Sequence, residues 1–254
     1  MHFIATADTD VGISKKTNQD SLLVKHASSE KGEIMMAIVC DGMGGLAKGE
    51  LASATVIRRF NEWFDEELPY ELVNIDMQII GAKWSLMLKE LNVEMLEYCK
   101  EHNVAMMGTT FSGILFVDHQ YVIVHVGDSR IYSIDSTLAQ LTSDHTFVAR
   151  EISRGNLTKE QAKTDKRRNM LLQCVGASKV VEPQVLYGNT KKGVYMICSD
   201  GFRHEVSESE IFESLNPINL INKDTMHNNA KYLIDTVKKR NEKDNISVIL
   251  IKVE

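Results

Sequence analysis

The order of its short apolar segments constrains most strongly what this chain can fold into. Segments rich in Ile, Val, Leu and Ala, a composition typical of strands, follow one another in blocks, with a pair of helical patterns between the first block and the next. The strand segments are residues 2–8, 21–26, 34–40, 109–117, 121–126, 130–134, 181–187, 194–198 and 246–253. Such blocks predict antiparallel sheets covered by helices, because a parallel sheet needs alternating strand and helix units.

The two helical patterns each place large apolar side chains on one face. These side chains recur at intervals of three or four residues, the period of an α-helix. They are Ala52, Val56, Phe60 and Trp63 in the first helix and Ile80, Trp84, Leu88, Leu91 and Met95 in the second. Pro69 stands between them, so we predict an antiparallel helical hairpin. Further helices are predicted at about 208–214 and 228–240.

The composition is that of an ordinary globular protein and argues against several classes. The chain of 254 residues has no Ser/Gly-rich linker, so we predict one domain over 1–254. Its net charge of −6 argues against a nucleic-acid-binding protein, which would need a concentrated basic surface. No apolar run approaches the roughly 20 residues of a membrane span, and no secretory signal is visible. The four cysteines are scattered, as expected of ordinary reduced thiols, so we predict a cytoplasmic location. We also predict a monomer that does not bind membranes.

Aspartates stand at the ends of several strand segments, beside glycine or another small residue. They are Asp20, Asp41, Asp128, Asp200 and Asp244. One Asp-Gly pair alone is more often a simple turn. Carboxylates that converge, however, repel one another by several kcal/mol at about 4 Å and an intermediate dielectric, and a divalent cation relieves that repulsion. Oxygen donors without a Cys or His cluster predict Mg²⁺ or Mn²⁺ rather than Zn²⁺.

Six motifs, taken in order, resemble the metal-dependent PPM phosphatases, also called the PP2C type, and their compact bacterial members in particular. The resemblance extends from about Ile4 to Ile251. The motifs are Thr17-Asn18-Gln19-Asp20, Asp41-Gly42-Met43-Gly44-Gly45, Gly108-Thr109-Thr110, Gly127-Asp128-Ser129-Arg130, Ser199-Asp200-Gly201 and Asp244-Asn245-Ile246-Ser247.

This resemblance implies an α+β fold, an αββα four-layer sandwich of two antiparallel sheets flanked by helices, with two Mn²⁺ or Mg²⁺ ions in a cleft at one edge. Asp41 would bridge the ions, the carbonyl of Gly42 would bind one, and Asp200 and Asp244 the other, while Asp20 would act through bound water. The metal-activated water would attack phosphorus in line, without a phosphoenzyme. Asp41, Asp200 and Asp244 are therefore the predicted catalytic residues of a phosphoserine/phosphothreonine protein phosphatase.

Three positions depart from the family pattern. Lys15 replaces the arginine that usually grips the substrate phosphate, and lysine lacks the two-pronged donor geometry of arginine. Asp128 and His204 occupy the positions of a third metal site. Because imidazole suits Mn²⁺ better than Mg²⁺, we expect a third ion to be weak, absent or Mn²⁺-selective. Met43 replaces a histidine proposed as general acid in several eukaryotic members, so water would protonate the leaving group.

The polar stretch 145–179 corresponds to the flap beside the cleft in this family, and we expect it to influence substrate choice. Its Arg167 and Arg168 would contact a phosphopeptide. The predicted partners are phosphorylated proteins, substrates of a Ser/Thr kinase. Two alternatives stay open. One is a catalytically weak regulatory module, because Lys15 and His204 depart from the family pattern. The other is a phosphatase of small phosphorylated molecules.

Three other polar side chains have simpler interpretations. His125 lies inside an apolar segment and is predicted to be a hydrogen-bonded core residue. His145 is predicted to cap a helix. Arg130 is predicted to order the cleft through hydrogen bonds without touching phosphate.

Overall fold

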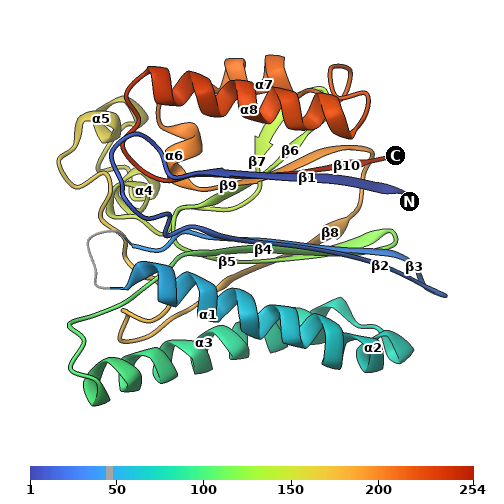
Figure 1. Ribbon diagram of the computed structural model, residues 1–254, viewed down its shortest axis with the longest axis horizontal. Helices are drawn as coiled ribbons and strands as arrows, with labels where there is room; N and C mark the ends of the chain where they lie inside the picture. Colours follow the sequence, from blue (N-terminus) through green and yellow to red (C-terminus); the bar gives the residue numbers. More distant parts are fainter. Residues whose placement is uncertain (44–47) are drawn as a thin grey trace.

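The computed structural model describes residues 1–43 and 48–254. In it, two five-stranded antiparallel sheets face one another and helices cover both outer faces (Figure 1). The predicted αββα sandwich is thereby confirmed. Gly44 and Gly45, which end the second motif, lie outside the described residues.

The strand order is β1-β10-β9-β6-β7 in the first sheet and β2-β3-β4-β5-β8 in the second. The strands of the first sheet are β1 (Phe3–Asp10), β10 (Ile246–Val253), β9 (Gly193–Cys198), β6 (Arg130–Ile134) and β7 (Leu138–Gln140). Those of the second sheet are β2 (Ser21–Ser29), β3 (Gly32–Cys40), β4 (Phe111–Val117), β5 (Gln120–Val126) and β8 (Gln184–Asn189).

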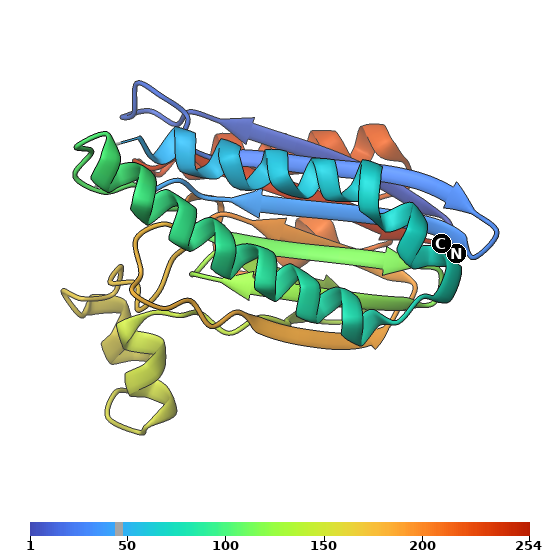
Figure 2. The same ribbon diagram turned by 90° about the horizontal axis from the view of Figure 1, so that it is seen from below.

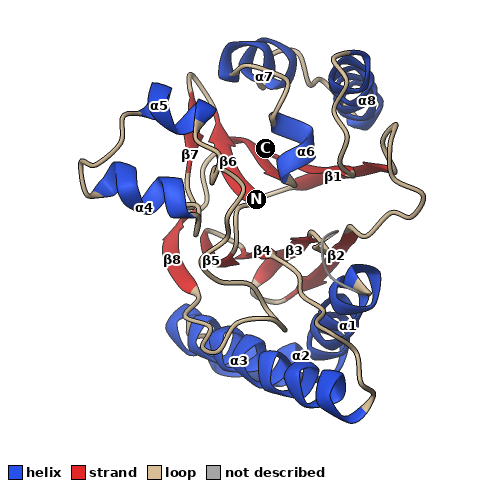
Figure 3. Ribbon diagram, turned by 90° about the vertical axis from the view of Figure 1, so that its left-hand side faces the viewer, coloured by secondary structure: helices blue, strands red, loops and turns tan. Residues whose placement is uncertain are grey.

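The helices fall into three groups along the chain. Those over the second sheet are α1 (Gly49–Glu62), the π-helical turn η1 (Trp63–Glu67), α2 (Leu68–Glu71), the 3₁₀ turn η2 (Leu72–Asn74) and α3 (Met77–Glu101). Those beside the sandwich are α4 (Phe147–Ser153) and α5 (Lys159–Thr164). Those on the side of the first sheet are α6 (Asp200–Arg203), α7 (Glu208–Leu215) and α8 (Lys223–Lys239). Figures 2 and 3 show α4 and α5 projecting from the sandwich.

Strand β3 shows why the sandwich forms. Successive side chains of a strand point to opposite faces. Met35 and Val39 therefore pack between the two sheets, while Met36 and Ile38 pack under the helices. Because both faces are covered, the strand is apolar along nearly its whole length and buried from Ile34 to Cys40.

Helices α1 and α3 lie side by side and run in opposite directions across the second sheet, as the predicted hairpin requires (Figure 2). Phe60, Trp63 and Trp84 are fully buried between them and the sheet, and the two tryptophans meet edge to face at 5.3 Å. Asp76 caps α3 by accepting hydrogen bonds from the backbone of Gln78 and Ile79. Within the described ranges, no helix is both long and apolar enough to cross a bilayer.

Several predicted boundaries were wrong; the strand expected at 21–26, for example, continues to Ser29. The strand expected at 181–187 begins three residues later, at Gln184. Gln173 binds both backbone groups of Glu182 through its side-chain amide, so residues before Pro183 are held to another loop rather than to β5. Helix α8 begins at Lys223 rather than near residue 228, because Asn222 and Thr225 form a capping box there. The short elements β7 and α6 were not predicted.

Candidate metal centre and catalytic cleft

The sheet registers bring the predicted aspartates to one end of the sandwich. Ser21 pairs with Cys40 across β2 and β3, so Asp20 and Asp41 lie at the same end of the second sheet. Asp200 follows β9, and Asp244 lies just before β10, the antiparallel neighbour of β9. Aspartates far apart in the sequence thus gather because antiparallel strands end where their neighbours begin.

The carboxylates of this cluster influence one another. Burial, and after it the negative charges of Asp20, Asp200, Asp128 and Asp244, raises the pKa of Asp41 well above its ordinary value. Burial also raises the pKa of Asp20 to about 7, and the charges of Asp200 and Asp244 add to the effect. The fold therefore pays an electrostatic cost for bringing these groups together.

Several carboxylate oxygens in the cluster are buried without a partner in the described part of the chain. Both side-chain oxygens of Asp20 and the Oδ1 atom of Asp200 lack a hydrogen-bond partner of ordinary geometry, although the hydroxyls of Ser247 and Ser199 lie close enough to Asp20 to oppose the rise of its pKa. Buried polar groups are nearly always satisfied in folded proteins, so these atoms call for a ligand. A hard divalent cation, alone or with its waters, fits unpaired carboxylate oxygens.

The cluster is not a ready-made metal cage. Within residues 1–43 and 48–254, no three His, Cys, Asp or Glu side chains are arranged so that they could hold a metal ion by themselves. Mg²⁺ commonly keeps several waters and takes only one or two protein carboxylates. Backbone oxygens and water would therefore belong to the ligand set.

The backbone around Asp41 is held by the third motif. The backbone N–H of Asp41 donates to the hydroxyl of Thr110 at 3.0 Å, and the hydroxyl of Thr109 donates to the carbonyl of Asp41 at 2.9 Å. A Cβ atom at Gly42 would lie 2.5 Å from the carbonyl oxygens of Gln19 and Gly49. Only glycine fits this close approach.

Asn245 holds the N-terminal loop against the cluster, a role that we did not predict from the sequence. Its side-chain oxygen accepts a hydrogen bond from the backbone of Gln19 at 3.0 Å. Its amide donates to the carbonyls of Val11 at 2.9 Å and Thr17 at 3.3 Å. Asn245 thereby positions the loop that carries Lys15 and Asp20. Its place beside Asp244 in the last motif was the available signal.

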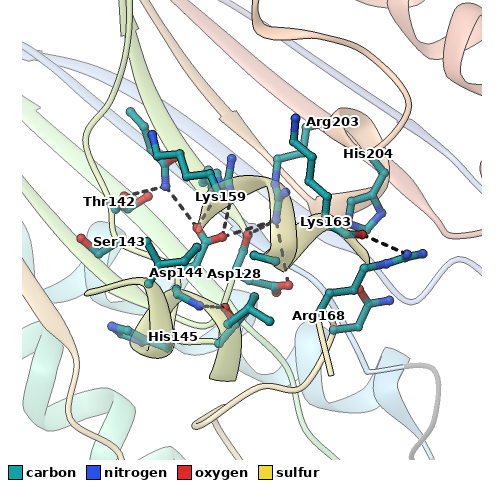
Figure 4. Close-up of a pocket in the computed structure, with 18 of the residues that line it drawn as sticks. Asp128, Thr142, Ser143, Asp144, His145, Lys159, Lys163, Arg168, Arg203 and His204 are labelled. Atoms are coloured by element: carbon teal, nitrogen blue, oxygen red, sulfur yellow. Dashed lines mark hydrogen bonds and ion pairs between the residues drawn. The ribbon is translucent and has the colours of Figure 1, made fainter. Parts of the chain in front are cut away.

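A cleft opens between this end of the sandwich and the projecting helices α4 and α5 (Figure 4). Of the predicted site residues, Lys15, Asp128, His204 and Asp244 line it. The other predicted ligands are not among its described lining residues: Asp20, Asp41, Gly42 and Asp200. In addition to burial, the negative charge of Asp200 raises the pKa of Asp128, and that of Asp244 raises the pKa of Asp20. The two aspartates that line the cleft, Asp128 and Asp244, therefore interact with the buried carboxylates.

Lys15 forms an ion pair with one aspartate of the acidic cluster, Asp244. Its Nζ atom is 3.1 Å from Oδ1 of Asp244, and the two side chains are about one third exposed, at 31% and 41%. The predicted phosphate-binding cation and a predicted metal ligand are thus ion-paired with one another.

Asp128 and His204 both have partners other than a metal ion. Arg203 donates to the backbone carbonyl of Asp128 at 3.0 Å, and its guanidinium lies 4.0 Å from the carboxylate. Burial raises the pKa of Asp128 to about 7, and the charge of Asp200 adds to this, while Arg203 opposes it. His204 lies 3.4 Å from Glu242 and 3.6 Å from Asp200. Although burial acts against protonation, Glu242 holds the pKa of His204 above its ordinary value. The raised pKa favours the imidazolium form, which cannot bind a metal ion.

Arg130 is engaged as expected, in hydrogen bonds that order the cleft. Its guanidinium donates to both carboxylate oxygens of Asp144, at 2.8 and 2.7 Å, and to the hydroxyl of Tyr132. Although burial acts to raise it, these bonds hold the pKa of Asp144 below its usual range.

The predictions for His125 and His145 had different outcomes. His125 is fully buried, with Nδ1 at 2.9 Å from the hydroxyl of Ser112, which confirms it as a hydrogen-bonded core residue. His145 does not cap a helix. Thr146 caps α4 instead, whereas Nδ1 of His145 accepts from the backbone of Gly127 at 3.2 Å.

A model of the protein phosphatase 2C family matches residues 13–238, most of the chain. The chain belongs to this family. It is 30% identical over 250 residues to the serine/threonine protein phosphatase PstP of Mycobacterium tuberculosis. That match covers 97% of this chain but only 44% of PstP, so the chain spans less than half the length of that relative.

Solved structures of PP2C phosphatases share the fold over nearly the whole chain. Serine/threonine phosphatase Stp1 from Staphylococcus aureus has a TM-score of 0.85 at 28% identity, covering 100% of this chain and 96% of Stp1. The catalytic domain of PstP in complex with two manganese ions has a TM-score of 0.79 at 28% identity, covering 98% and 97%. A PP2C-fold relative therefore binds two Mn²⁺ ions.

Proposed function

We propose that this chain is a metal-dependent phosphatase that removes phosphate from phosphoserine and phosphothreonine in proteins. The observation that carries the proposal is the set of buried, unpartnered carboxylate oxygens on Asp20 and Asp200, beside Asp41, whose pKa is strongly raised. Relatives of the chain are named serine/threonine phosphatases. A carboxylate cluster of this kind costs stability, and a cation that relieves the cost supplies the chemistry of a two-metal hydrolase.

Each predicted ligand has a role in this proposal. Asp41, the carbonyl of Gly42, Asp200 and Asp244 would hold the two Mn²⁺ or Mg²⁺ ions, and Asp20 would contribute through bound water. When bound, two such ions activate water for in-line attack on phosphorus and neutralise the charge on the phosphoryl oxygens.

Other residues of the chain then bind the substrate and complete the site. Lys15 binds the substrate phosphate once a metal ion competes for Asp244, its partner in the structure. Met43 has no proton to donate, so water protonates the leaving alkoxide. A third ion at Asp128 and His204 fits poorly, because Arg203 and Glu242 are already their partners.

A cysteine nucleophile is not part of the proposal. All four cysteines are buried and unbridged. Burial raises the pKa of Cys40 well above its ordinary value and that of Cys198 to about 12. The thiolate is the reactive form, so these side chains are poor nucleophiles. Free thiols also fit the reducing cytoplasm, where we place the activity and the kinase that produces its substrates.

The decisive test measures phosphate release from a phosphothreonine peptide without metal, with Mg²⁺ and with Mn²⁺. We expect metal-dependent release from the wild-type chain, loss of release in Asp200→Asn, and full activity in Asp235→Asn, the same change on the exposed face of α8. Folded protein that binds Mn²⁺ but releases no phosphate would instead support a regulatory module. Faster turnover of free phosphorylated metabolites than of peptides would support a small-molecule phosphatase.

A further inference from the structure

Four basic side chains of the 145–179 flap line the cleft, and three of them, Lys159, Lys163 and Arg168, are not paired with an acidic residue in the described part of the chain, whereas Arg150 is paired with Glu151. Lys159 and Lys163 lie four residues apart on α5, which places them on the same side of the helix. Arg168 lies in the turn that follows. All three line the cleft that Lys15 and Asp244 also line, and Figure 4 shows them together at the cleft.

These three cations have no acidic partner in the part of the chain that the structure describes. The other arginines of the flap are paired: Arg150 and Arg154 contact Glu151, and Arg167 contacts Asp165. Within the described residues, the Arg168 side chain makes a single hydrogen bond, to the carbonyl of Lys163, and it is long at 3.4 Å. Lys159, Lys163 and Arg168 therefore keep their charge available for a ligand.

The structure separates the members of the basic run 166–168. Arg167 donates two hydrogen bonds to the carboxylate of Asp165, at 3.0 and 2.8 Å, and stacks on Phe147 at 4.1 Å. Neither Lys166 nor Arg167 lines the cleft. Of the predicted substrate contacts, Arg168 is thus well placed and Arg167 is not.

The opposite wall of the cleft carries negative charge. Glu205 and Glu208, near the start of α7, line it together with Glu210 and Glu242. Glu210 is paired with Arg240, and Glu242 with His204, whereas Glu205 and Glu208 form no ion pair within residues 1–43 and 48–254. Glu160, between the two lysines of α5, also lines the cleft, and Lys243 lies among the acidic residues of the opposite wall. The three flap cations nevertheless outnumber Glu160, and Glu205 and Glu208 outnumber Lys243, so an acidic side chain of a peptide would be repelled by this wall and attracted by the flap.

We propose that the flap selects phosphopeptides with acidic residues next to the phosphorylated side chain, through Lys159, Lys163 and Arg168. The inference rests on the proposed function and adds the class of substrate. Exposed ion pairs are individually weak, so each cation should contribute about two- to five-fold in peptide binding and the three together on the order of ten-fold or more. The effect should weaken as ionic strength rises.

The test compares two phosphothreonine peptides of equal length, one with three flanking aspartates and one with asparagines in their place. We expect wild-type protein to have a KM about ten-fold lower for the acidic peptide, with similar kcat. The triple variant Lys159→Gln, Lys163→Gln, Arg168→Gln should lose this preference. Lys166→Gln, an exposed flap cation outside the cleft, should keep it.

A small substrate separates the inference from the proposed function. 4-Nitrophenyl phosphate has no flanking residues, so the triple variant should hydrolyse it as the wild type does. If it does but wild-type protein shows no preference for the acidic peptide, or the triple variant retains one, the flap proposal is wrong. If neither peptide nor 4-nitrophenyl phosphate is hydrolysed, the proposed function fails. Fluorescence anisotropy with the two labelled peptides then still decides whether the flap binds acidic peptides.

Discussion

The two walls of the cleft are built in opposite ways. On the sandwich side, the aspartates stand at strand ends, and hydrogen bonds with the side chains of Thr109, Thr110 and Asn245 hold the surrounding backbone. On the flap side, α4 has no buried residue and α5 only Ala162, and the cations are exposed. The proposed chemistry, which needs fixed distances, would thus be carried by packed sheets, whereas the proposed substrate selection would be carried by a loosely packed segment.

The largest effect is expected on the sandwich wall. Asp41→Asn should reduce metal-dependent phosphatase activity by on the order of 10³-fold, because the central carboxylate is lost. The same change removes repulsion from the cluster, so the metal-free variant should be more stable than wild-type protein. Activity assays and thermal unfolding in EDTA measure the two effects. A variant that lost activity and also melted earlier in EDTA would mean that Asp41 serves the fold rather than the metal.

The pH dependence of stability should also distinguish the walls. In metal-free protein the pKa of Asp20 is about 7, above its ordinary value of 3.8, so the folded state binds more protons than the unfolded state between these values. Stability must therefore fall as pH rises from about 4 to 7. We expect the Tm in EDTA to drop by at least about 3 °C, which corresponds to roughly 1 kcal/mol in a chain of this size.

Two controls check this origin. Asp20→Asn should reduce the pH dependence in EDTA and leave the part contributed by Asp128 and Asp41, whose pKa values are also raised. Saturating Mn²⁺ should raise the Tm more at pH 7 than at pH 5, since the ion binds the deprotonated carboxylates. An unchanged pH profile in Asp20→Asn would assign the effect to other groups.

Arg203 tests whether a fixed cation replaces a third metal ion on the sandwich wall. Its guanidinium lies 4.0 Å from Asp128. Arg203→Met should tighten Mn²⁺ binding at Asp128 by on the order of ten-fold, because a competing positive charge is removed, whereas Arg203→Lys should change little. Native mass spectrometry and calorimetric titration count the ions. Three tightly bound ions in the wild type, one of them lost in Asp128→Asn, would contradict the replacement.

The smallest effect is expected for substitution of Lys15, the predicted phosphate-binding residue, which is ion-paired with the predicted metal ligand Asp244. Lys15→Arg should lower the KM for 4-nitrophenyl phosphate by about two- to five-fold, because guanidinium can bind phosphate through two parallel hydrogen bonds. Lys31→Arg, in the exposed turn between β2 and β3, is the matched control. Equal KM values in all three proteins would show that Lys15 does not bind the phosphate.

Much of the fold and of the site could be predicted from local patterns. The apolar run of β3, the spacing of Phe60 and Trp63 in the first helix and of Trp84 in the second, and the Asp-Gly pairs at strand ends are local patterns. They predict antiparallel sheets covered by helices, with acidic residues at strand ends, whereas the four-layer sandwich and the set of metal ligands were implied by the family resemblance.

Only the tertiary structure decided which charges meet. The pairs Lys15–Asp244, Arg203–Asp128 and His204–Glu242 join residues 229, 75 and 38 positions apart, and no local period specifies such contacts. The same holds for the flap, where packing of Arg167 on Phe147 leaves Arg168 to face the cleft. The sequence by itself determined the fold and the kind of chemistry at the strand ends. The choice of partner for each charge depended on long-range packing, because side-chain pairing is decided by distances that only the folded chain defines.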